Sequence, residues 1–159
     1  MLDTNLINEF YNIRILGIFK TFCEANDNSR NRKRLRNIMT LSQNKTNTIK
    51  EIFKREYRIE LNESEALRMN DLIKAFLNKS NYRKSITNSL KTKLLENQKR
   101  KCAICSCNID IRAHADHIVP FKYVGDCLEN NWQLLCKHCN EAKNDSLDYQ
   151  IRHLLRLTK

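Results

Sequence analysis

Apolar side chains recur every three or four positions along much of the first two-thirds of the chain, which is the spacing of amphipathic helices. Three stretches carry this pattern, and their apolar faces are formed by Ile7, Tyr11, Ile15, Ile18 and Phe22; Met69, Leu72, Ile73 and Phe76; and Tyr82, Ile86, Leu90 and Leu94. The chain has only two glycines and one proline, so few residues interrupt such helices. The pattern therefore predicts a small helical bundle.

Two capping boxes predict where helices begin. Thr48 is followed three residues later by Glu51. Asn62 is followed in the same way by Glu65. In each pair the first side chain can accept a hydrogen bond from an early helix amide while the glutamate reaches back to the cap. The polar stretch TLSQNKTNT at residues 40–48 predicts a loop before the first of these helices.

The helical pattern ends near KRK at residues 99–101, after which cysteines, histidines and short apolar runs such as IVPF and WQLLC follow. We therefore place a domain boundary near residue 96, between a helical domain at 1–96 and a second domain at 97–159. The second domain is predicted to end in a helix whose apolar face is formed by Leu147, Ile151, Leu154 and Leu155.

Charge adds a class of partner to this picture. The 159 residues carry a formal net charge of +11, and a polyanion is the partner that such a field favours. The run RNRKRLR at residues 30–36 concentrates this charge and is the candidate DNA-contacting surface, through Arg30, Arg32, Lys33, Arg34 and Arg36. A solvated helix face is the alternative interpretation of the run. Charge alone does not separate DNA, RNA and anionic lipid.

Hydropathy argues against a membrane protein. No run of 18 or more apolar residues occurs, and the N-terminal MLDTNLINEF lacks a basic region followed by an apolar stretch. We therefore expect neither a membrane span nor a signal peptide, and a cytoplasmic location.

Two CxxC pairs predict a metal site. Cys102 and Cys105 form the first pair, Cys136 and Cys139 the second, and in a reducing compartment such pairs bind zinc far more often than they form disulfides. Four thiolates fill the tetrahedral coordination of Zn²⁺ and leave no open position, so this zinc is expected to be structural. Cys107 is expected to lie outside the site, because Cys102 and Cys105 have the same two-residue spacing as Cys136 and Cys139.

The segment between the two pairs has its own signal. ADHIVP at residues 115–120 sets Asp116 directly before His117 and ends in the single proline of the chain. Together with CAIC before it and NNWQLLCKHCNEAK after it, this stretch resembles the zinc-knuckle form of the HNH nuclease module, over residues 102–143. The resemblance implies an α+β protein in which a helical N-terminal domain precedes a zinc-stapled ββα-metal (HNH, treble-clef-like) module.

The resemblance also implies site residues. His117 takes the first family position, with Asp116 as its acidic neighbour, and Asn131 takes the middle position. Asn140 stands where the family often has histidine, followed by Lys143. An amide oxygen at that place favours a hard cation, and hence Mg²⁺ or Mn²⁺.

These residue types suit phosphodiester hydrolysis. The imidazole of His117 can take a proton from water near neutral pH, and Asp116 with Asn140 can offer oxygen ligands to one divalent ion. Asn131 is expected to bond the backbone near His117 and so fix the ring. Lys143 shares a helix face with Asn140 and is expected to reach phosphate.

The sequence thus predicts a metal-dependent HNH endonuclease acting on DNA, with RNA as the other substrate the charge allows. A restriction or phage-defence role is expected, with intron-type and phage-packaging nucleases as alternatives. Double-strand cleavage would need a homodimer or two sequential nicks. The competing hypothesis is a zinc module that binds nucleic acid or protein without cutting it.

Overall fold

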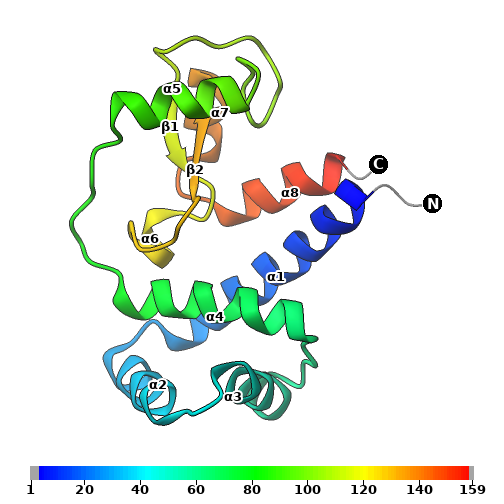
Figure 1. Cartoon of the computed structure of the whole chain (residues 1–159), viewed down its shortest axis with the longest axis vertical. Helices are drawn as coiled ribbons and strands as arrows, with labels where there is room; N and C mark the ends of the chain where they lie inside the picture. The colour runs from blue at the N-terminus through cyan, green and yellow to red at the C-terminus, as the bar shows by residue number, and fades with distance from the viewer. Residues whose placement is uncertain (1–3, 158–159) are drawn as a thin grey trace.

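The computed structural model describes the backbone of residues 4–157 and the side chains of residues 13–156. Helices come first along the chain, and they are α1 (Thr4–Asn26), α2 (Ser29–Leu41), α3 (Lys45–Ile52) with a π-helical turn η1 (Phe53–Tyr57), α4 (Glu63–Asn78) and α5 (Asn88–Asn97). A compact unit follows, made of β1 (His114–His117), α6 (Phe121–Val124), β2 (Trp132–Leu135) and α7 (Lys137–Lys143). The last element, α8 (Leu147–Leu157), lies beside α1 (Figure 1). The α+β class is confirmed.

Aromatic side chains hold α1 to α4 together. Phe22 lies in the middle, with its ring centroid 5.5 Å from that of Phe53 and 5.9 Å from that of Phe76. All three side chains are completely buried, and Phe19 packs edge-on against Phe76. Along the first predicted stripe, Ile15 and Phe22 are buried and Ile18 packs partly against them. Ile7 and Tyr11 lie outside the residues whose side chains the structure describes.

The capping predictions divide into one that is confirmed and one that is wrong. Asn62 and Glu65 form the complete capping box of α4. Thr48 caps nothing, because α3 begins earlier at Lys45, where Asn44 is the cap and accepts from the amide of Asn47. The predicted loop at 40–48 is accordingly reduced to residues 42–44.

The third predicted helical stripe is also largely wrong. Residues 79–87 form an extended segment rather than a helix, and Tyr82 on it is 76% exposed. The helix begins only at Asn88, because the Thr87 side chain caps it by accepting from the Leu90 amide. Leu95 is the buried residue of α5. The extended segment leads from α4 to α5 along one side of the molecule (Figure 1).

The two strands form an antiparallel hairpin whose register places Asp116 opposite Gln133 and His117 opposite Trp132. Gln98, directly after α5, continues the sheet on its open side, because its side-chain amide donates to the carbonyl of Leu134 and accepts from the amide of the same residue. Helix α7 then packs against both strands. This β-β-α order is the arrangement that the sequence predicts.

The main hydrophobic core crosses the predicted boundary near residue 96. Val119, Val124 and Leu147 are buried in the same cluster as the apolar residues of α1 to α4. An ion pair between Lys20 on α1 and Asp148 on α8 spans the same junction at 2.9 Å. The two regions therefore pack as one unit. No helix within residues 4–157 is long and apolar enough to cross a membrane.

Candidate functional site

Four cysteine sulfurs lie together at one end of the hairpin. The sulfurs of Cys102, Cys105, Cys136 and Cys139 are all within 4.8 Å of one another, and this group is a potential zinc-binding site. The local fold builds it, because Cys136 is the N-cap of α7 and its sulfur accepts from the Cys139 amide at 3.4 Å. The Cys136 amide in turn points to the sulfur of Cys102 at 3.4 Å. Cys107 lies outside the cluster.

The four sulfurs of the cluster are close enough to shift one another's pKa. Burial, together with hydrogen bonds from neighbouring thiols, raises the pKa of the Cys139 thiol. The pKa of the more exposed Cys105 is lowered, and the largest cause is a hydrogen bond with the backbone of Cys107. A divalent ion would supply the positive charge that lets all four sulfurs be thiolates.

His117 occupies the end of β1 in a tightly defined position. Its ring centroid lies 4.0 Å from that of Trp132 and 5.6 Å from that of Phe121. Its Nε2 is 2.8 Å from Oδ1 of Asp126, and the residue is only 2% exposed. Within the described part of the chain, no buried side-chain nitrogen or oxygen lacks a hydrogen-bond partner. Nδ1 of His117 has no hydrogen-bond partner among the described residues, and His117 lines a cavity.

Asp116 directly precedes this histidine on β1. Its Oδ2 accepts from Nζ of Lys143 at 2.8 Å and from Nε2 of Gln133 at 3.1 Å. Gln133 is fixed in turn by Gln150 of α8 at 3.0 Å. The other carboxylate oxygen, Oδ1, makes no hydrogen bond within the described residues, and the side chain is 13% exposed. One oxygen of Asp116 is therefore available to a ligand.

A cavity of about 220 Å³ brings the two side chains to one place. Because β1 ends at His117, the alternation of the strand does not separate the pair, and both residues line this cavity. The other residues along its wall are Arg83, Pro120, Phe121, Lys122, Asn144 and Asp145. We call this space the Asp116–His117 cavity.

Asn131 ties the chain after His117 to the start of β2. Its side-chain amide donates to the carbonyl of Val119 and accepts from the amide of Val119, both at 2.8 Å. Its own backbone carbonyl accepts from the amide of Ile118. Asn131 is 3% exposed, so it stabilises the backbone behind the histidine and does not reach the cavity.

The structure turns Lys143 inward and places Asn140 outside the lining of the Asp116–His117 cavity. The ammonium of Lys143 is buried, donating to Asp116 and, at 2.8 Å, to the carbonyl of His117, so it does not point toward a phosphate. Helix α7 packs with this face against β1, which turns the lysine inward. Asn140 lies one turn before Asn144 and does not line the Asp116–His117 cavity, whereas Asn144 does.

Two residues of the site carry no motif signal. Asp126 bonds His117 and also accepts from the backbone amide of Lys84 at 2.6 Å. Burial acts to raise the pKa of the Asp126 carboxyl, but these hydrogen bonds outweigh it and hold the pKa below its usual value. The guanidinium carbon of Arg83 lies 5.0 Å from the ring centroid of Phe121, at the cavity wall.

The basic run at residues 30–36 forms part of α2, and three of its five cations have partners inside the protein. Arg32 pairs with Asp27 and lies over the ring of Phe76, Arg34 makes two hydrogen bonds to Glu56, and Arg36 donates to the carbonyl of Leu77. Only Arg30 and Lys33 have no partner within the described residues. The five-residue phosphate surface stays a prediction, and Arg30 and Lys33 are its two cations without an internal partner among the described residues.

Comparison with known proteins bears on this module alone. A family model described as HNH endonuclease matches residues 102–146. Neither the curated proteins nor the solved structures give a match. The matched residues contain both cysteine pairs, the hairpin and α7. The resemblance seen in the sequence is confirmed, and the chain carries a domain of the HNH endonuclease family at residues 102–146.

Proposed function

We propose that this protein is a metal-dependent endonuclease that hydrolyses phosphodiester bonds in DNA. The family implies a nucleic-acid substrate. The observation that carries the proposal is the Asp116–His117 cavity, which both the histidine and the carboxylate residue line. A zinc module that only binds nucleic acid has no need of this arrangement.

In this proposal His117 is the general base. Its Nδ1 accepts a proton from a water molecule while the water oxygen forms a bond to phosphorus. The bond from phosphorus to the 3′ oxygen breaks, and that oxygen takes a proton from solvent. The guanidinium of Arg83 at the cavity wall is placed to attract the phosphate.

The cavity also offers oxygen donors for a divalent ion. Asp116 has a free carboxylate oxygen and Asn144 an amide oxygen, and hard donors of this kind suit Mg²⁺ or Mn²⁺. When bound, such an ion offsets the charge that develops on the phosphate and leaving oxygens. Asn144 takes this role in place of Asn140, because only Asn144 lines the cavity. Zinc in the cysteine cluster has a structural role only.

The test is plasmid cleavage by the zinc-loaded protein with Mg²⁺ or Mn²⁺, and with EDTA as the metal-free arm. We expect parent protein to nick the plasmid only with the added ion. His117→Gln should abolish nicking and retain DNA binding, because affinity comes mainly from phosphate contacts. Asp116→Ala should recover part of its activity at raised metal concentration.

Comparison of melting temperatures shows whether either variant has merely unfolded. A folded His117→Gln variant that nicks as fast as the parent would overturn the proposal and favour the non-cutting zinc module. An RNA substrate of the same length, assayed in parallel, tests the choice of DNA.

Within the same proposal we assign the nuclease to restriction or phage defence in the cytoplasm. The positive charge, +11 over 159 residues, suits a protein that engages long nucleic acid without a partner to supply affinity. Expression in a phage-sensitive host tests this role. Plaque counts should fall with the parent and not with His117→Gln.

A further inference from the structure

We propose that Asp126 is a positioning residue that fixes the tautomer and the orientation of His117, and that the helical region outside the HNH match holds Asp126 in place. The inference rests on the proposed function, since it assigns how the base of that reaction is prepared. Asp126 lies nine residues from His117 and belongs to none of the motifs that predicted the site.

The hydrogen bond between the two side chains is sheltered from water. Nε2 of His117 lies 2.8 Å from Oδ1 of Asp126, and the side chains are 3% and 8% exposed. Trp132 and Phe121 contact the ring and leave little room for it to turn. Both the distance and the packing therefore favour one ring orientation.

A carboxylate accepts hydrogen bonds and donates none, which decides where the imidazole proton lies. With Asp126 ionised, the neutral ring carries its proton on Nε2, and Nδ1 keeps its lone pair toward the cavity. When Nδ1 takes a proton from water, the ring becomes a cation, and the carboxylate at Nε2 stabilises it. The geometry of this pair thus meets both needs of a general base.

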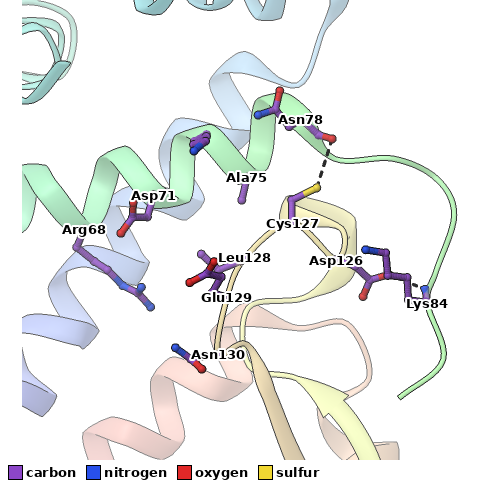
Figure 2. A pocket seen from close by; sticks show the side chains of 11 residues that line it. Arg68, Asp71, Ala75, Asn78, Lys84, Asp126, Cys127, Leu128, Glu129 and Asn130 are labelled. Carbon is purple, nitrogen blue, oxygen red and sulfur yellow. Dashed lines mark hydrogen bonds between the residues drawn. The ribbon is translucent and has the colours of Figure 1, made fainter. Parts of the chain in front are cut away.

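Asp126 is itself anchored by residues that precede the HNH match. The amide of Lys84 donates to Oδ2 of Asp126 at 2.6 Å, and the next residue, Cys127, donates to the carbonyl of Asn78 at 3.4 Å. Figure 2 shows both contacts as dashed lines, joining the loop at Asp126 to the end of α4 and the extended segment after it.

Gly125 explains how the loop comes so close to that segment. Its φ is +58°, in the region that favours glycine, and a Cβ there would lie 3.1 Å from the Cβ of Lys79. The carboxylate of Asp126 thus contacts His117 of the hairpin on one side and Lys84 of the extended segment on the other. The orientation of His117 therefore depends on residues outside 102–146.

The first arm of the test measures the tautomer directly. The ¹⁵N shifts of the imidazole in the zinc-loaded protein, at a fixed pH where the ring is neutral, distinguish a proton on Nε2 from one on Nδ1. We expect the Nε2–H form in the parent. An Nδ1–H form in the parent overturns the inference without any variant.

The second arm uses Asp126→Asn, which keeps the size of the side chain and an oxygen for the Lys84 amide. We expect mixed or inverted tautomers and a single-turnover cleavage rate lower by about 100-fold, within the range that general bases contribute. The DNA dissociation constant should stay within about threefold of the parent value, because no phosphate contact is removed. Asp71→Asn, on α4 at the cavity that Asp126 also lines, is the matched control and should cleave like the parent.

Loss of rate with unchanged DNA affinity and an altered tautomer supports the inference. Parent-like cleavage by Asp126→Asn overturns it, as does a loss of rate in which the tautomer of the folded variant is unchanged. If Asp126→Asn does not fold, Asp126→Glu replaces it, with partial activity and a retained Nε2–H form expected. A parent that cuts no nucleic acid overturns the proposed function, and with it the catalytic role of the pair.

Discussion

Replacing Lys143 with methionine should lower the free energy of unfolding, although the sequence predicted a phosphate contact for this residue and no role in stability. The ammonium is fully buried, and its two acceptors, the carboxylate of Asp116 and the carbonyl of His117, both lie at 2.8 Å. Removing one partner of a buried pair costs about 3–5 kcal/mol, because the remaining charge keeps its desolvation penalty. Methionine retains most of the packing volume, and Gln133 still donates to the carboxylate. We therefore expect a loss at the lower end, about 3 kcal/mol.

Urea unfolding of the zinc-loaded protein, followed by circular dichroism, measures this loss. Lys137→Met is the matched control on the same helix, since its side chain is 78% exposed and its ion pair with Glu141 spans 3.9 Å. That control should stay within about 0.5 kcal/mol of the parent. Adding Asp116→Asn to Lys143→Met should recover part of the lost stability, because it removes the unpaired charge. A loss below about 1 kcal/mol for Lys143→Met would show that the ion pair is not buried as described.

Metal binding and surface charge give further measurable outcomes. Cys136→Ser should lose stoichiometric zinc in metal analysis and several kcal/mol of stability, because the fourth thiolate closes the site; retention of zinc and of the parent melting temperature would contradict the structural role. Replacing Arg30 and Lys33 with serine should reduce the slope of log K against log salt by about 2, whereas an unchanged slope would identify a solvated face. Asn144→Gly should raise the Mg²⁺ concentration for half-maximal cleavage by about tenfold or more, because it removes the amide oxygen. Glycine is the replacement because φ at Asn144 is 48°, which glycine adopts without strain. Asn140→Ala should raise it less, and the opposite order would restore Asn140 as the ligand.

The parts of the site that the sequence predicted depend on local chemistry. The CxxC spacing delivers two sulfurs from one turn, so the cysteine cluster follows from four residues and their intervals. The Asn62–Glu65 capping box needs only one helical turn, and the structure contains it. Thr48 failed as a cap because Asn44, four residues earlier, had an equally suitable side chain and the helix extended back to it.

The parts that could not be predicted depend on packing between distant segments. Helical spacing correctly put Asn140 and Lys143 on one side of α7, but only the contact with β1 decides that Lys143 turns inward to Asp116. Residues 79–87 have apolar residues at helical intervals, yet they form the extended connection between α4 and α5. Asp126 finds one partner nine residues away and another 42 residues away, and no periodicity records such pairs.

The helical region therefore has a structural role in addition to the DNA contact proposed for it. Val119, which precedes α6, and Val124, the last residue of α6, are 2% and 0% exposed because α1 to α4 supply the rest of their core. Without that region each would return to water, at a cost of about 1.5–3 kcal/mol apiece. The same separation would remove the Lys84 amide from Asp126 and leave His117 without its fixed acceptor. Core packing and the preparation of the proposed base thus depend on the same junction, so a change that loosens α4 against the Asp126 loop should reduce cleavage even when both cysteine pairs still hold zinc.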